Sequence, residues 1–150
     1  MTDLSCRRRE TRTVAARDPA LDGIRILVVD DDLGVCHSLR DLLTQEGCRV
    51  TVATGGREGL ARLETDAVDL VLSDVVMPDL DGYELFQQAR QRDPDLPVVL
   101  MTAFHFDKDH IIKRSRLAGI TDVVYKKPID PPRLREIIKR HARHPRPLAG

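Results

Sequence analysis

Short apolar segments alternate with amphipathic ones along this chain of 150 residues, and few folds are compatible with that alternation. The short segments are rich in β-branched residues, as buried strands are; they span 24–29, 49–53, 70–73, 98–102 and 122–125. The other segments carry apolar residues at helical spacing; they span 33–43, 57–64, 83–89, 111–117 and 134–138. Strands alternating with helices predict an α/β fold, a doubly wound parallel sheet covered on both faces.

The composition argues against several classes of function. Lys plus Arg and Asp plus Glu both number 24, so the formal net charge is zero, which disfavours direct binding of nucleic acid. No apolar stretch reaches membrane-spanning length, and the polar, Arg-rich start lacks the apolar core of a signal peptide. The cysteines, Cys6, Cys36 and Cys48, have no metal-binding spacing and suit a reducing compartment. We expect a cytoplasmic protein without membrane contact.

One domain between two tails is the expected organisation. Residues 1–22 are rich in Arg and have no periodic apolar face, which predicts a flexible leader. Residues 142–150 are rich in Pro and basic residues and predict a short tail. Residues 23–141 hold every predicted strand and helix, and their number suits a single domain. The sequence leaves open whether the chain acts alone or belongs to a longer protein.

Acidic residues follow two of the predicted strands. Asp74 comes directly after the apolar run 70–73, and the cluster Asp30, Asp31 and Asp32 follows the run 24–29. In a doubly wound sheet the first and third strands are neighbours, and ligands bind where the carboxyl ends of the strands meet. We therefore expect these side chains to form one pocket.

Carboxylates brought close together repel one another unless a cation lies between them. Mg²⁺ prefers oxygen ligands, whereas the loops after these strands lack the His and Cys typical of zinc sites. Asp30, Asp31 and Asp74 are therefore predicted metal ligands. Asp32 is predicted to cap the following helix, a role that needs only one acid.

A carboxylate can also act as a nucleophile and form an aspartyl phosphate, whose charge requires a fixed cation nearby. Lys126 or Lys127, at the end of the fifth predicted strand, is placed to supply that cation. Thr102, which ends the fourth strand, offers a hydroxyl to a phosphoryl oxygen, and the small Ala103 beside it leaves space for the group.

Together these motifs resemble the receiver domain of two-component response regulators, the CheY-like family. The matching stretches are ILVVDDD at 26–32, DVVMPDLDG at 74–82, VLMTA at 99–103 and KP at 127–128. The resemblance covers roughly residues 23–141. It implies a five-stranded, flavodoxin-like fold with strand order 2-1-3-4-5, and a signalling domain rather than an enzyme, apart from self-catalysed phosphorylation and dephosphorylation.

The resemblance also implies a role for each matched residue. Asp74 would accept a phosphoryl group from a sensor histidine kinase or a histidine phosphotransfer protein. Mg²⁺ would be held by Asp31 directly, by Asp30 largely through water, by Asp74 and by the backbone carbonyl of Val76. Thr102, Ala103 and Lys127 would contact the phosphoryl group. A conformational switch would then signal to a protein partner not identified by the sequence, or drive a homodimer through the fourth helix, fifth strand and fifth helix.

Two departures from the family pattern affect these roles. Counting forward from Gly119 makes Lys126 the phosphoryl-binding lysine, whereas counting back from Pro128 makes it Lys127. We prefer Lys127, because the Lys-Pro linkage sets the geometry. The family's switch aromatic falls at a valine, and Tyr125 is displaced from that position. A switch that couples Thr102 to Tyr125 would need a bulge in the strand.

Two other functions fit parts of the sequence. One is a degenerate receiver that serves only as a scaffold. The other is an aspartate-nucleophile phosphatase, in which Asp30 and Asp32 would be the acid pair; that family expects Thr or Val where Gly34 stands. For the receiver function, the aliphatic Val76 offers no group to orient an attacking water. It therefore predicts slow self-dephosphorylation.

Overall fold

The computed structural model describes residues 19–102, 119–120, 122–125 and 129–143. Five strands form one parallel sheet in the order β2-β1-β3-β4-β5, which confirms the predicted fold class and strand order. The strands are β1 (Arg25–Val29), β2 (Arg49–Ala53), β3 (Leu70–Asp74), β4 (Val98–Thr102) and β5 (Asp122–Tyr125).

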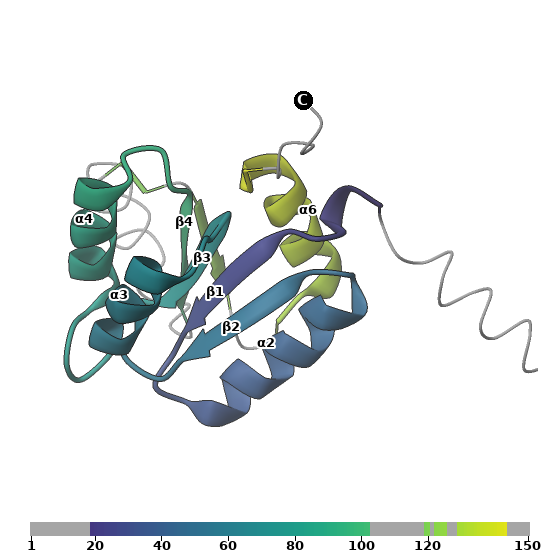
Figure 1. The fold of residues 1–150 in the computed structure, drawn as a ribbon. Helices are drawn as coiled ribbons and strands as arrows, with labels where there is room; N and C mark the ends of the chain where they lie inside the picture. Colours follow the sequence, from purple (N-terminus) through teal and green to yellow (C-terminus); the bar gives the residue numbers. More distant parts are fainter. Residues whose placement is uncertain (1–18, 103–118, 121, 126–128, 144–150) are drawn as a thin grey trace, which may run out of the picture.

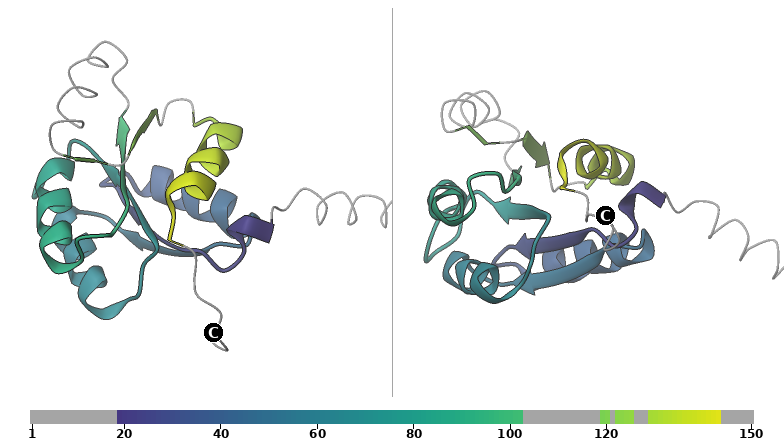
Figure 2. Two further views of the ribbon diagram at one scale, coloured as in Figure 1. Left: turned by 90° about the horizontal axis from the view of Figure 1, so that it is seen from above. Right: turned by 45° about the horizontal axis from the view of Figure 1, so that its top comes forward.

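Helices cover both faces of this sheet (Figures 1 and 2). They are α2 (Leu33–Gln45), α3 (Gly56–Thr65), α4 (Gly82–Arg92) and α6 (Pro131–His141). Helices α3 and α4 pack on one face, and α2 and α6 pack on the other. The helix predicted at 111–117 lies outside the described residues.

The period-two alternation of strand side chains divides the core into two layers. On β1, Leu27 and Val29 pack with the residues of α3 and α4, whereas Ile26 and Val28 pack with those of α2 and α6. Both faces are apolar because both are covered by helices, which is why the strands read as continuous apolar runs in the sequence. No helix in the described parts of the chain has the length and apolar character needed to cross a membrane.

Packing extends slightly beyond the predicted limits of the domain. The 3-10 helix η1 (Pro19–Leu21) places Leu21 in the core beside α6. At the other end, the backbone N–H of Arg143 donates to the carbonyl of Asp69, and its guanidinium bonds Asp93 and the carbonyl of Val68. The division into leader, domain and tail stays a prediction.

The amino-terminal edge of the sheet is held together by one buried acid. Asp69 immediately precedes β3, and its carboxylate accepts hydrogen bonds from the backbone N–H, Nε and Nη2 of Arg25, the first residue of β1. These bonds raise the pKa of Arg25 above its ordinary value. They join β1 to β3, the two strands whose opposite ends carry the predicted acids.

This arrangement predicts the effect of Asp69→Asn. An amide cannot accept all three bonds and turns its own N–H donors toward a guanidinium, so we expect a loss of about 2 kcal/mol in the free energy of unfolding. Urea denaturation followed by circular dichroism measures it. Asp41→Asn, an isosteric change at an exposed position of α2, is the control and should leave stability unchanged. Equal stability of the two variants would contradict the role given to Asp69.

Candidate functional site

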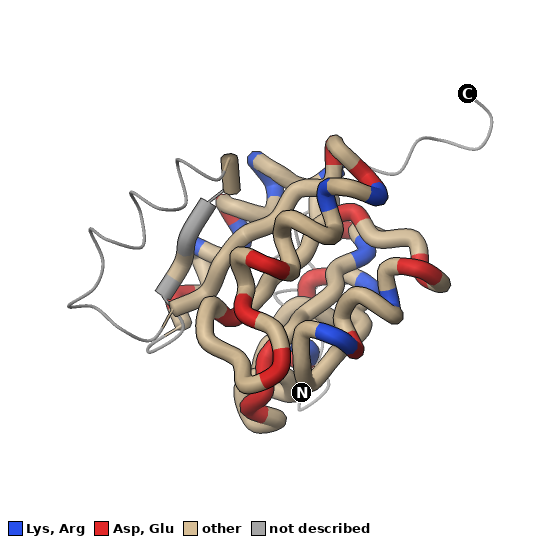
Figure 3. Tube along the Cα trace, turned by 90° about the vertical axis from the view of Figure 1, so that its left-hand side faces the viewer, with Lys and Arg blue, Asp and Glu red and all other residues tan. Residues whose placement is uncertain are grey.

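The predicted acidic pocket forms at the carboxyl-terminal edge of the sheet. Asp30 and Asp31 follow β1, and Asp74 is the last residue of the neighbouring strand β3. One carboxylate oxygen from each of these three residues lies within 4.8 Å of the other two. Figure 3 shows several acidic stretches gathered in the lower left of the view, on the side toward which β1 and β2 run in Figure 1.

Asp30 is completely buried, and its environment organises the loop that follows β1. Its carboxylate Oδ1 accepts a hydrogen bond of 2.9 Å from the backbone N–H of Asp32, and its own N–H donates to the carbonyl of Ala53 at the end of β2. The Cys36 thiol on α2 donates to the carbonyl of Asp30. Asp30 is thus fixed by the loop after β1, by β2 and by α2.

Asp32 has the capping role that the sequence predicted. It is the N-cap of α2, and its Oδ1 accepts from the backbone N–H groups of Gly34 at 2.9 Å and Val35 at 3.3 Å. Its carboxylate is therefore engaged with the helix. Asp31, between the buried Asp30 and the capping Asp32, is exposed and completes the three-acid cluster.

Asp74 is 6% exposed at the end of a fully buried strand. The hydroxyl of Ser73 donates to the carbonyl of Asp74. Gly82, the first residue of α4, lies so close that an added Cβ would stand 2.5 Å from that same carbonyl. The start of α4 therefore packs against the backbone of Asp74. The Asp74 side chain lies at the edge of the core, where it is almost completely buried.

Thr102 lies at the same edge of the sheet. It is the buried last residue of β4, one position beyond Met101, which pairs with Asp74. Its partner in β5 is Tyr125, and the register from Asp122 to Tyr125 is continuous, so no bulge interrupts that strand. Ala103, Lys126 and Lys127 lie outside the described residues.

Val76 is an exposed apolar residue of the loop after β3. It is 60% exposed, whereas Val75 and Met77 on either side are buried. The backbone N–H of Val75 donates to the carbonyl of Met101 on β4, which continues the pairing of β3 and β4 by one residue. Val76 follows directly and lies two residues beyond Asp74.

The donor set of this edge fits a divalent cation with oxygen ligands. Three carboxylates from the ends of two neighbouring strands converge, one exposed and two buried, and no His or Cys is among them. Such a set suits Mg²⁺ or Ca²⁺ and does not suit zinc. The arrangement can hold a hard cation beside a carboxylate that is able to act as a nucleophile.

One residue of this region was not identified from the sequence. Asp79 accepts hydrogen bonds from the backbone N–H groups of Gly56 and Arg57 at the start of α3, each at 3.1 Å. The bond from Arg57, aided by the one from Gly56, lowers the pKa of Asp79 below its ordinary value. The available signal was Gly55, which precedes α3 and has no side chain with which to cap it.

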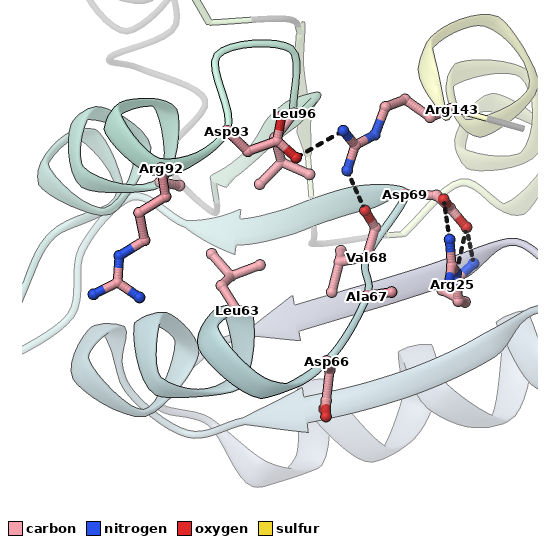
Figure 4. A pocket seen from close by; sticks show the side chains of 11 residues that line it. Arg25, Leu63, Asp66, Ala67, Val68, Asp69, Arg92, Asp93, Leu96 and Arg143 are labelled. Atoms are coloured by element: carbon pink, nitrogen blue, oxygen red, sulfur yellow. Dashed lines mark hydrogen bonds and ion pairs between the residues drawn. The ribbon is translucent and has the colours of Figure 1, made fainter. Parts of the chain in front are cut away.

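A separate pocket of about 430 Å³ lies at the opposite, amino-terminal edge of the sheet (Figure 4). Leu63, Val68 and Leu96 contribute apolar surface to it. Its three arginines are each paired with a carboxylate, in the pairs Arg25–Asp69, Arg92–Glu64 and Arg143–Asp93. This pocket is distinct from the acidic cluster, and its paired charges favour no particular ligand.

Residues 26–139 match the family model of the response regulator receiver domain. The chain belongs to this family, as its motifs suggested. It is 48% identical over 80 residues to the response regulator MprA of Mycolicibacterium vanbaalenii, a match that covers 53% of this chain and 35% of that protein. Membership implies, in general terms, signalling in a two-component system with a histidine kinase as partner.

Solved structures agree with this assignment. A CheY-like receiver domain protein from Methanospirillum hungatei JF-1 has a TM-score of 0.70 and 33% identity, covering 79% of this chain and 93% of that one. The response regulator TrrA of Thermotoga maritima, solved in complex with Mg²⁺ and BeF, has a TM-score of 0.68 and 30% identity. That match covers 78% of this chain and 97% of TrrA.

The crowding of three carboxylates predicts that Asp31→Asn stabilises the metal-free protein. Replacing the exposed member of the cluster by an amide removes like-charge repulsion without creating a cavity. In a buffer with chelator, we expect its melting temperature to exceed that of the wild type, as followed by circular dichroism. Asp41→Asn removes one negative charge at a distance and should leave the melting temperature unchanged. A lower melting temperature for Asp31→Asn would contradict the repulsion.

Proposed function

We propose that this receiver domain accepts a phosphoryl group on Asp74 with the help of Mg²⁺ and signals the change to a protein partner. The observation that carries the proposal is the convergence of Asp30, Asp31 and Asp74, with oxygens within 4.8 Å, at the edge of the sheet where ligands bind in doubly wound folds. Family membership supports it, and so does the Mg²⁺ in the related TrrA structure.

The residues that would hold Mg²⁺ are Asp31, Asp30 through water, Asp74 and the backbone carbonyl of Val76. Bound there, the cation would neutralise the carboxylates and the incoming phosphoryl oxygens. The burial of Asp30 and the bond from Asp32 to it fix one side of the cluster before any ligand arrives. The site is then preorganised, which lowers the cost of binding.

In the proposed transfer, a carboxylate oxygen of Asp74 attacks the phosphorus of a phosphohistidine. The phosphorus–nitrogen bond breaks, and its electron pair returns to the departing imidazole. The hydroxyl of Thr102 donates to a phosphoryl oxygen, Ala103 leaves room for the group, and Lys127 neutralises its charge, with Lys126 as the rival. The phosphoryl donor is a sensor histidine kinase or a histidine phosphotransfer protein.

Signalling would follow from rearrangement of Thr102 and of the surface near β5. The described part of β5 lies in continuous register beside β4, without the bulge that a switch through Tyr125 would need, so the proposed signal starts at Thr102 and does not depend on that aromatic residue. The output would be contact with a further protein, or a homodimer through the helix predicted at 111–117, β5 and α6. We infer a signalling domain whose only chemistry is its own phosphorylation and dephosphorylation.

The proposal predicts a single phosphoryl adduct on Asp74. Incubation with acetyl phosphate and Mg²⁺, followed by intact-mass spectrometry, should show one adduct on the wild type and on Asp41→Asn. The adduct should be absent from Asp74→Asn, which lacks the nucleophile, and from wild type treated with chelator. Transfer from a histidine kinase should show the same dependence.

Other results of this experiment support the alternatives. Absence of the adduct from a wild type that binds Mg²⁺, with both acetyl phosphate and a kinase as donors, would favour a degenerate scaffold. Repeated hydrolysis of a small phosphomonoester would favour an aspartate-nucleophile phosphatase. An adduct that persists in Asp74→Asn would place the acceptor elsewhere.

The exposed Val76 predicts a slow loss of the phosphoryl group. An aliphatic side chain cannot orient a water for attack, whereas Val76→Asn supplies an amide at the same exposed position. We expect this variant to shorten the lifetime of the phosphorylated protein about tenfold, or ~1.4 kcal/mol of barrier. Leu33→Asn is the control, an exposed apolar residue at the start of α2, and should keep the wild-type lifetime. A wild-type lifetime of seconds would contradict the prediction.

A further inference from the structure

The loop between β3 and α4, residues 75–81, is attached to the core although several of its residues are exposed. Val75, Met77 and Leu80 are buried in the core beneath α3 and α4, whereas Val76 stands out toward solvent. At its far end the loop closes on its start, because the backbone N–H of Gly82 donates to the carbonyl of Val75 at 2.9 Å. The middle of the loop has one further attachment.

Asp79 supplies that attachment. It is exposed, but both of its carboxylate oxygens bond the first turn of α3, Oδ1 to the N–H of Gly56 and Oδ2 to the N–H of Arg57. These are two of the backbone donors that a helix start leaves without partners. The cap of α3 thus comes from residue 79, which is 23 positions further along the chain than Gly56.

Two glycines bring the loop and α3 into this close approach. An added Cβ at Gly55 would stand 3.0 Å from Oδ2 of Asp79, and one at Gly56 would stand 2.6 Å from Cβ and 2.7 Å from the carbonyl oxygen of Leu80. A side chain at Gly56 would push the loop away from the helix, whereas one at Gly55 would displace the carboxylate of Asp79. The contact between the loop and α3 therefore depends on Asp79 in the loop and on the absence of side chains at Gly55 and Gly56.

Helix α3 also contacts β1, the strand that Asp30 and Asp31 follow. At Gly59 an added Cβ would stand 2.9 Å from Cγ2 of Val29, the residue immediately before Asp30. The same helix therefore contacts the end of β1 through Gly59 and the loop after β3 through Gly55, Gly56 and Asp79. It joins the two segments from which the carboxylates of the acidic cluster come.

From these contacts we propose that Asp79 is a positioning residue for the metal. By tying the loop to α3, it holds the backbone at Val76 in a set place relative to Asp30, Asp31 and Asp74. The inference rests on the proposed function, in which the Val76 carbonyl is a Mg²⁺ ligand. Groups that orient a metal ligand change affinity without touching the metal.

A purely structural role must be separated from this one, because the loss of a helix cap lowers stability by itself. The chain offers a direct way to do so. Gly55 is the N-cap of α3 and has extended backbone, so Gly55→Ser can supply a cap from within the helix itself. In an Asp79→Ala background, the carboxylate that a side chain at Gly55 would meet is gone. The double variant then has a capped helix without a tethered loop.

The experiment compares wild type, Asp79→Ala, Asp79→Ala with Gly55→Ser, and Asp41→Ala as a control for the lost charge. Three quantities are measured: the melting temperature, the Mg²⁺ dissociation constant by calorimetry, and amide hydrogen exchange of residues 75–81 in chelator. For Asp79→Ala we expect a lower melting temperature, faster exchange and a dissociation constant raised about tenfold. Asp41→Ala should match the wild type in exchange of residues 75–81 and in Mg²⁺ affinity, while its melting temperature can rise slightly because Ala favours the helix more than Asp does.

In the double variant, the melting temperature should return toward that of the wild type, while fast exchange and weak Mg²⁺ binding remain. Recovery of all three together would overturn the inference and leave Asp79 as a helix cap only. Unchanged exchange and affinity in Asp79→Ala would overturn it as well. A wild type that binds no Mg²⁺ would instead overturn the proposed function, and the positioning role with it.

Discussion

The carboxyl-terminal edge of the sheet holds three carboxylates close together despite their mutual repulsion. The strands, helices and loops around them keep them in that position. Two of the carboxylates, on Asp30 and Asp74, are also buried at the end of an apolar core, where a charged group loses most of its hydration. The backbone that carries the cluster is held in place on several sides. The pairing of β1 with β3, the capped start of α2 and the close contact of α4 with Asp74 all restrict its movement.

Three glycines allow α3 and α4 to lie very close to the strands and loops at the acidic edge of the sheet. Through Gly59, α3 packs against Val29, and through Gly56 its first turn packs against Leu80. Through Gly82, α4 packs against the carbonyl of Asp74. None of these glycines has the positive φ that usually explains the choice of glycine. They are required by the approach of another part of the backbone or core, so that the acidic edge is built by steric fit as much as by charge.

Much of this could be predicted from local sequence. The five strands, the parallel doubly wound sheet and the convergence of Asp30, Asp31 and Asp74 follow from periodicity and from the position of acids after apolar runs. The capping role of Asp32 follows from its place before a helix. The bonds from α3 to Asp79 could not be predicted in this way, because they join residues far apart in the chain. The burial of Leu21 and the bonds of Arg143 likewise depend on tertiary contacts that two tail-like segments make with the rest of the domain.

The attachment of Arg143 bears on how a change at the acids could travel. Its bonds to Val68, Asp69 and Asp93 fix the end of the described chain at the amino-terminal edge, and β3 separates that edge from Asp74 by five residues, roughly 15 Å. Arg143 is thus anchored at the edge of the sheet opposite the loops around the acids. Movement of those loops would reach Arg143 through α6 or through the sheet, whereas α3 and α4 contact the segment around Asp74 and Asp79 directly.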